Sequence, residues 1–96
     1  MSYRLRYSER VAGQFGELPP EFVDVVEENL RRLADSPTTW SERIASPPFA
    51  PRGQLFHFNA IGFGGSSWFF TVIFRYSQDE TALHILSVTW RELIDE

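Results

Sequence analysis

The chain has 96 residues, with nine arginines, no lysine and thirteen acidic residues, which gives a formal net charge of −4. That length predicts one domain, residues 1–96, around a single hydrophobic core. The absence of cysteine excludes disulfides, thiol catalysis and thiolate metal sites. No apolar run approaches the roughly 20 residues of a membrane span, so we expect a cytoplasmic protein without a membrane partner. The acidic balance disfavours RNA or ribosome binding through the overall field, although a local arginine patch is compatible with it.

The N-terminal segment predicts a strand and then a short helix. Residues 3–7 alternate between apolar side chains and arginines, which is the period of a half-buried strand, and Arg4 and Arg6 share its solvated side. Ser8 stands where a helix N-cap is expected. The proline pair at 19–20 ends this helix and can start the next one.

Residues 21–35 carry the clearest helical pattern of the chain. Acidic residues occupy its first half and arginines follow, in the order that the helix dipole favours. We interpret the acidic residues as a solvated helix face rather than a metal or catalytic cluster. The apolar stripe of this helix is broad and is predicted to consist of Phe22, Val26, Leu30 and Leu33, joined by Val23 and Val25.

The middle of the chain has weaker patterns. Residues 36–53 hold four of the six prolines and predict a connector, within which residues 41–45 could form one helical turn. Residues 54–59 alternate again and predict a strand. The glycine-rich run at 60–67 lacks the lysine of a phosphate-binding P-loop, so we interpret it as a loop between strands. Residues 91–96 are expected to form a short acidic tail.

Residues 68–90 predict a β-hairpin whose polar loop is centred on residues 77–80. Placing Tyr76 opposite Thr81 fixes which side chains share a face. The expected core face carries Trp68, Phe70, Val72, Phe74 and Tyr76 against Thr81, Leu83, Ile85, Ser87 and Thr89. The expected second face carries Phe69, Thr71, Ile73 and Arg75 against Ala82, His84, Leu86, Val88 and Trp90. The second face mixes apolar and polar side chains, which makes it the candidate for function.

The predicted order is β-α-α-β-β-β, an α+β domain with an antiparallel sheet of about four strands and two helices on one face. Three stretches with this order, residues 3–18, 18–37 and 69–90, resemble the RelE/ParE superfamily of toxins from type II toxin–antitoxin systems. The resemblance covers nearly the whole chain. It implies a small toxin-like domain that an antitoxin protein neutralises by wrapping around it.

Within that superfamily, the ribonuclease branch cuts messenger RNA on the ribosome with arginines on the middle strands and acid–base residues near the end of the fold. The ParE branch acts by binding a protein target such as DNA gyrase. This chain departs from the ribonuclease pattern, because Phe70 stands where the family has an arginine and Trp90 stands where a histidine commonly ends the last strand. The departures favour action by protein binding.

Candidate site residues follow from the second hairpin face and its neighbours. If RNA is cleaved, His84 is the candidate acid or base and Arg75, its diagonal neighbour, the candidate phosphate clamp. His57 and Arg52 could join them from the adjacent strand. The remaining candidates for a binding surface are Phe69, Thr71, Ile73, Leu86, Val88, Trp90 and Arg91. No metal site and no cofactor is expected.

Three functional hypotheses therefore remain. The first is a toxin that acts by binding a protein and presents an apolar surface to its antitoxin. The second is a ribosome-dependent endoribonuclease of the RelE kind. The third is a non-toxin interaction domain that forms a homodimer and buries the second hairpin face against its copy. Two observations would separate these hypotheses: a neighbouring antitoxin reading frame, and an arginine–histidine cleft in the structure.

Overall fold

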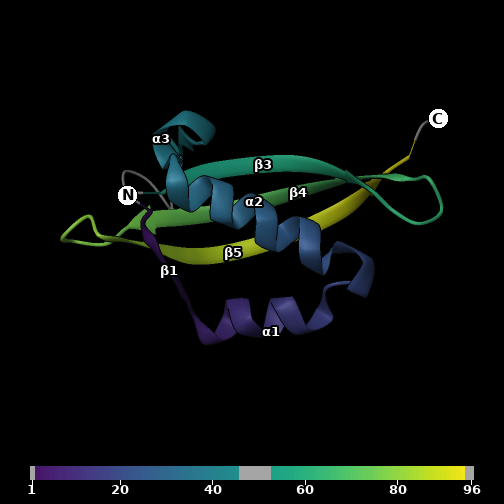
Figure 1. Cartoon of the computed structure of the whole chain (residues 1–96), viewed down its shortest axis with the longest axis horizontal. Helices are drawn as coiled ribbons and strands as arrows, with labels where there is room; N and C mark the ends of the chain where they lie inside the picture. The colour runs from purple at the N-terminus through teal and green to yellow at the C-terminus, as the bar shows by residue number, and fades with distance from the viewer. Residues whose placement is uncertain (1, 46–52, 95–96) are drawn as a thin grey trace.

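A strand and two helices precede the rest of the sheet in the computed structural model, which describes residues 2–45 and 53–94 (Figure 1). The elements are β1 (Arg4–Tyr7), α1 (Glu9–Glu17), the 3-10 turn η1 (Pro20–Phe22), α2 (Val23–Asp35), α3 (Pro37–Trp40), β2 (Glu42–Arg43), β3 (Gln54–Ile61), β4 (Ser67–Tyr76) and β5 (Ala82–Leu93). The predicted strands and the two main helices are all present. The single helical turn of the connector lies at α3, earlier than the predicted 41–45.

The sheet is mixed and has five strands in the order β1-β5-β4-β3-β2. Strands β3, β4 and β5 form the predicted antiparallel meander. The prediction of a four-stranded antiparallel sheet was wrong in two respects. Strand β1 pairs with β5 in parallel, and β2 adds a two-residue strand beside β3. Parallel pairing needs a long crossover, and here the crossover is the rest of the chain between β1 and β5.

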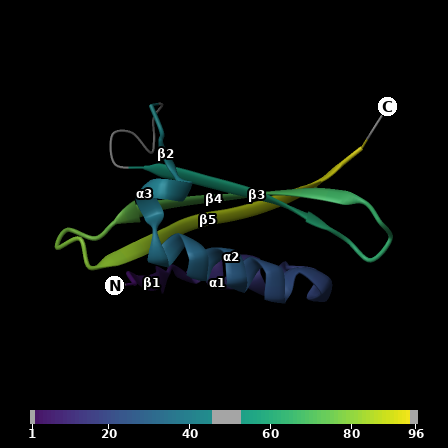
Figure 2. The ribbon, with the colours of Figure 1, turned by 45° about the horizontal axis from the view of Figure 1, so that its top comes forward.

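Helices α1 and α2 lie on the same side of the sheet (Figure 2). Ser8 is the N-cap of α1, as predicted, and its hydroxyl accepts a hydrogen bond of 3.2 Å from the Val11 amide. Val26, Leu30 and Leu33 of the predicted stripe are buried, and Phe22 is buried just before the helix begins. The other two predicted members differ, because Val25 is half-buried and Val23 is 37% exposed.

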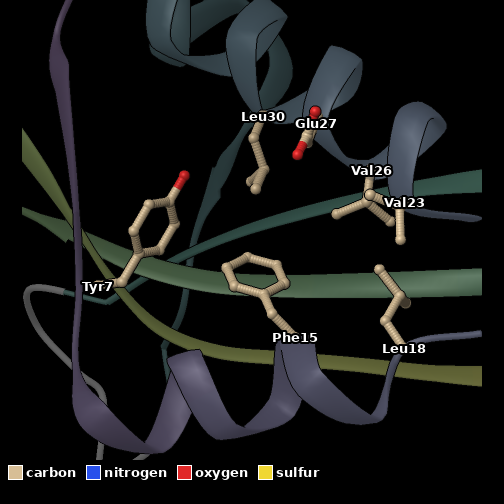
Figure 3. Close-up of a pocket in the computed structure, with 7 residues that line it drawn as sticks. All are labelled: Tyr7, Phe15, Leu18, Val23, Val26, Glu27 and Leu30. Atoms are coloured by element: carbon tan, nitrogen blue, oxygen red, sulfur yellow. The ribbon is translucent and has the colours of Figure 1, made fainter. Parts of the chain in front are cut away.

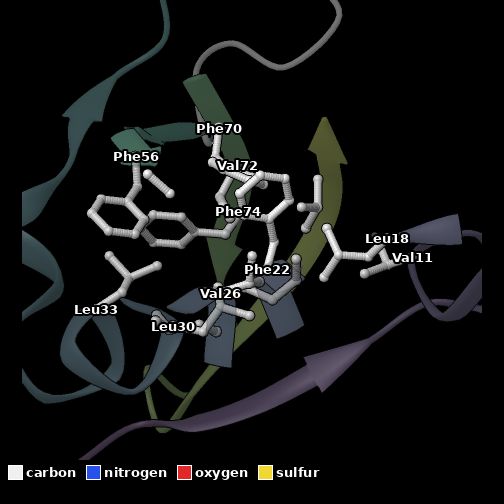
Figure 4. Close-up of a cluster of buried hydrophobic side chains, with 14 residues drawn as sticks. Val11, Leu18, Phe22, Val26, Leu30, Leu33, Phe56, Phe70, Val72 and Phe74 are labelled. Carbon is white, nitrogen blue, oxygen red and sulfur yellow. The ribbon is translucent and has the colours of Figure 1, made fainter. Parts of the chain in front are cut away.

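The core lies between these helices and the sheet (Figure 4). The Phe22 ring packs against Trp68 and Phe70, with ring centroids 5.3 and 5.1 Å away. Phe58 stacks on Phe70 with centroids 4.9 Å apart. Burying a side chain of this size contributes about 1.5–3 kcal/mol, so this aromatic group anchors α2 to the sheet.

The β4–β5 loop is longer than the sequence suggested. Tyr76 lies opposite Leu83, not opposite Thr81. Ser77 closes the loop, because its amide donates to the Ala82 carbonyl at 2.8 Å and its hydroxyl accepts from the Thr81 and Ala82 amides. These bonds hold residues 77–81 out of the ladder.

A β-bulge interrupts β5 near its middle. Ile73 lies opposite Ser87 and Phe74 opposite Ile85, so Leu86 is an extra residue without an opposite partner. A single extra residue reverses the alternation of all side chains that follow it. The faces predicted for β5 therefore hold before the bulge and are inverted after it.

The inversion corrects two predicted site residues. Val88 lies opposite Val72 and is only 1% exposed, so it belongs to the core and not to an exposed binding surface. Trp90 lies opposite Phe70 and packs against the same core. The exposed side chains of Thr89 and Arg91 take their place on the second face.

The C-terminal segment was also predicted wrongly in part, because β5 continues to Leu93 and residues 91–93 are strand rather than a separate tail. Within the described ranges, none of the helices combines the length and apolar character that a membrane crossing requires.

Candidate functional site

The sheet face turned away from α1 and α2, here called the open face, carries most of the basic side chains of the strands. Directly opposed residues share a face, so the register defines its members. They are Arg4 and Arg6 on β1, His84, Ser87, Thr89, Arg91 and Leu93 on β5, Ser67, Phe69, Thr71, Ile73 and Arg75 on β4, Leu55, His57, Asn59 and Ile61 on β3, and Glu42 on β2.

Three of these residues form a row across the sheet. Arg75 lies opposite His84, and Arg6 of β1 lies opposite His84 on its other side. Neighbouring strands are about 4.8 Å apart, so two guanidinium-bearing side chains flank one imidazole. We call Arg6, His84 and Arg75 the arginine–histidine row. The predicted pair of His84 and Arg75 is therefore brought together, as direct rather than diagonal neighbours.

The surroundings of His84 disfavour its protonated form. Burial lowers the pKa of His84 below its usual value, and the charges of Arg75 and Arg6 lower it further, against a smaller opposing effect of Asp79. Both a low-dielectric setting and nearby cations penalise the imidazolium ion. His84 is therefore a neutral imidazole at neutral pH, with a nitrogen lone pair able to accept a proton.

Phe69 is the centre of a second group on the open face. The Arg91 guanidinium lies 5.6 Å from the centre of the Phe69 ring, and the His57 ring packs edge-on with centroids 5.4 Å apart. A hollow of about 120 Å³ lies beside Phe69, and its other lining residues are Thr71, Thr89, Trp90 and Arg91. We call Phe69, Arg91, His57, Thr71 and Thr89 the Phe69 cluster.

The remaining predicted site residues fall in different places. His57 lies opposite Thr71, which is four residues along β4 from Arg75, or about 13 Å, so His57 is not part of the arginine–histidine row. Ile73 and Leu86 lie at the bulge and are half-buried. Arg52 lies outside the described residues.

The two sides of the molecule differ in charge. The acidic residues of the helical segment lie on α1, η1 and α2, beyond the core from the open face. The open face carries four arginines and two histidines, with Glu42 at the far edge on β2. The open face is therefore basic, although the net charge of the whole chain is −4. Local fields of this kind decide which ligands approach a face more than the net charge does.

A second pocket, of about 240 Å³, lies between α1 and α2 (Figure 3). It is mostly apolar, and Tyr7 and Glu27 provide its polar groups. Burial raises the pKa of the Tyr7 hydroxyl, and the Glu27 carboxylate raises it further. No prediction from the sequence concerned this pocket. Its apolar lining residues are Phe15, Leu18, Val23, Val26 and Leu30.

Sequence reasoning missed Arg6 as a member of the site, because Arg6 was interpreted as part of a solvated strand face. Its importance depends on the parallel pairing of β1 with β5, which no local pattern signals. The bulge did leave a signal. The apolar residues Ile85 and Val88 are three positions apart, which breaks the period of two and indicates one extra residue between them.

One of three comparisons with known proteins finds a similar fold. A search of solved structures finds a structure of the Escherichia coli toxin RelE, an arginine-to-alanine double mutant in the free state. The TM-score is 0.60 with 16% sequence identity, and the match covers 92% of this chain and 82% of that chain. A scan against protein families and a search of curated proteins give no match. The chain therefore has a RelE-like fold.

Proposed function

We propose that this protein is a toxin component of a type II toxin–antitoxin system, and that its open face binds RNA. The observation that carries the proposal is the arginine–histidine row, in which Arg6 and Arg75 flank His84 on a sheet face that α1 and α2 leave uncovered. The RelE-like fold supports the toxin assignment. The hypothesis that the toxin acts by binding a protein through this face is less favoured, because Val88 lies in the core and Trp90 packs against it.

Phosphate groups explain the residue types of the row. Arginine presents a planar set of donors that matches phosphate oxygens and retains its charge at all relevant pH values. Two such side chains, one on either side of His84, can bind the non-bridging oxygens of phosphate groups in an RNA backbone. They would also stabilise the extra negative charge that develops on the phosphorus when a 2′-hydroxyl attacks it.

His84 supplies the group that could make this binding site an endoribonuclease. A neutral imidazole can take the proton of the 2′-hydroxyl as that oxygen attacks the neighbouring phosphorus, and the 5′-oxygen then leaves with a proton from water. The lowered pKa of His84 keeps the accepting nitrogen free at neutral pH. Cleavage is the second, more specific part of the proposal.

Induced expression in a bacterial host tests both parts. Growth and transcript integrity are scored for the wild type, for His84→Gln, and for the double variant Arg75→Ala/His84→Ala. The control is Glu28→Gln, which changes an exposed side chain on α2 and leaves the open face intact. We expect growth arrest with cut transcripts that His84→Gln and the double variant relieve and Glu28→Gln does not.

Other outcomes separate the hypotheses. Arrest with intact transcripts would contradict RNA cleavage and favour a protein target. Normal growth in all variants would contradict a toxin function under those conditions. Arrest and cleavage that survive the loss of His84 would contradict its catalytic role.

The far end of the sheet suits an antitoxin. Ile61 and Leu93 flank Ser67 in one row of the open face, and both are exposed. Phe63 in the β3–β4 loop is 90% exposed and Ile94 is 77% exposed. Exposed apolar groups in this density are typical of partner sites. We propose that a protein partner covers this end, either an antitoxin segment or, as the alternative, a second copy of the chain.

A further inference from the structure

The hollow beside Phe69 has the dimensions and the lining of a site for one flat ring. Its volume of about 120 Å³ is comparable to the roughly 150 Å³ of a cavity that holds a benzene molecule. Phe69 and Arg91 line the hollow, and the Arg91 guanidinium lies over the Phe69 ring. Thr71 and Thr89, which lie opposite each other on β4 and β5, are also lining residues.

The position of Phe69 contrasts with that of its neighbour Phe70. Phe70 is fully buried and stacks on Phe58, so its ring is explained by the core. Phe69 points to the opposite face, where an edge-on imidazole and a guanidinium hold its ring in place. Packing of the core therefore does not account for an aromatic side chain at this position.

The chemistry of the hollow matches a nucleobase. Proteins that bind single-stranded RNA stack unpaired bases on aromatic side chains or on the guanidinium plane of arginine. Threonine hydroxyls both donate and accept hydrogen bonds, so they can contact the polar edge of a base. A phosphate site, in contrast, would have no use for the Phe69 ring.

We infer that the hollow of the Phe69 cluster is a subsite for one unstacked base of single-stranded RNA. The inference rests on the proposed RNA-binding function and adds to it a position that reads the base rather than the backbone. Thr71 is about 13 Å along β4 from Arg75. One nucleotide does not span that distance, so the inference requires an RNA strand that runs along β4 with more than one nucleotide between the row and the hollow.

The test measures binding of two oligonucleotides to the purified protein by fluorescence anisotropy. Both have a 2′-O-methyl backbone, which cannot be cut because it has no free 2′-hydroxyl; one carries its bases and the other is abasic. The variants are Phe69→Leu, which keeps an apolar side chain without a stacking face, and Phe69→Tyr, which keeps the ring. Trp40→Leu is the matched control, because it removes an exposed aromatic side chain on α3 that belongs to neither proposed site.

We expect the base-containing oligonucleotide to bind about tenfold more tightly than the abasic one, as stacking on one aromatic side chain provides. Phe69→Leu should remove this preference, whereas Phe69→Tyr and Trp40→Leu should keep it. Thr89→Val, a change of similar shape without the hydroxyl, should weaken the preference for the base-containing oligonucleotide. This second variant tests the subsite even if Phe69→Leu does not fold.

Two results would overturn the inference and are distinguishable from each other. Equal binding of both oligonucleotides would leave RNA binding in place and remove the base subsite. A base preference that survives Phe69→Leu and Thr89→Val would place the subsite elsewhere. Failure of both oligonucleotides to bind would instead contradict the proposed function, and the subsite with it.

Discussion

The two faces of the sheet are built from the same three long strands and differ in what covers them. One face packs its phenylalanines and valines against α1 and α2, and the acidic residues of the helices lie beyond that core. The other face carries arginine, histidine and threonine between half-buried apolar side chains. One face of the sheet therefore stabilises the fold, and side chains on the other face can change with little cost in stability.

The largest expected effect is on the free energy of unfolding, and it is tested by substituting two adjacent residues, Phe69 and Phe70, that lie on opposite faces of the sheet. Phe70→Ala removes a fully buried ring that contacts Phe22 and Phe58, so it should lower the free energy of unfolding by about 3–5 kcal/mol. Phe69→Ala, one residue earlier on the open face, should lower it by about 1 kcal/mol or less. Urea denaturation followed by circular dichroism measures both, and equal losses would contradict the comparison.

A smaller effect is expected where α1 supports the strand beyond the bulge. The Val88 amide donates a 2.8 Å hydrogen bond to Oε1 of Gln14, because β1 has ended and offers no carbonyl there. Gln14→Ala should lower the free energy of unfolding by about 1 kcal/mol, since it leaves a part-buried amide without its acceptor. Gln78→Ala, in the exposed β4–β5 loop, is the control and should have almost no effect. A loss of the same size in both variants would show that the hydrogen bond does not stabilise β5.

The smallest expected effect concerns Asp79 in the loop that connects β4 and β5. Hydrogen bonds from Ser77 and Thr81 lower the pKa of the exposed Asp79 carboxyl to about 2. A lowered pKa means that the ionised form stabilises the fold. This contribution is present above the ordinary pKa of 3.8 and is lost as the pH falls through about 2.

The Asp79→Asn variant should therefore unfold at a slightly lower urea concentration than the wild type at pH 6, and the difference should disappear near pH 2. The same change removes the charge that opposes Arg75 and Arg6 at His84, so the pKa of His84 should fall further in an NMR titration. An unchanged or higher pKa of His84 would contradict the electrostatic description of the arginine–histidine row.

Much of the fold could be predicted, because helices and buried stripes leave periodic patterns. The stripe of Val26, Leu30 and Leu33 repeats at helical spacing, and the structure buries all three. The cap at Ser8 is equally local. These features depend on residues within one or two helical turns of each other, so a local sequence pattern is enough to predict them.

The candidate site was predicted less well, because it depends on non-local geometry. Arg75 and His84 were predicted as a pair since one hairpin contains both. Arg6 joins them only through a parallel pairing across most of the chain, which strand alternation does not encode. Trp90 was placed on the wrong face because a pairing that is regular from the loop onward cannot include the bulge at Leu86.

That bulge has a consequence for how the gene can change. Removing Leu86 would leave Ile73 opposite Ser87 and Phe74 opposite Ile85, so both faces would keep their side chains. An insertion or deletion of one residue farther along β5 would instead turn Arg91 toward the core and Trp90 toward solvent. In related sequences, we therefore expect one-residue insertions and deletions to occur at Leu86 and to be rare in the part of β5 that follows it.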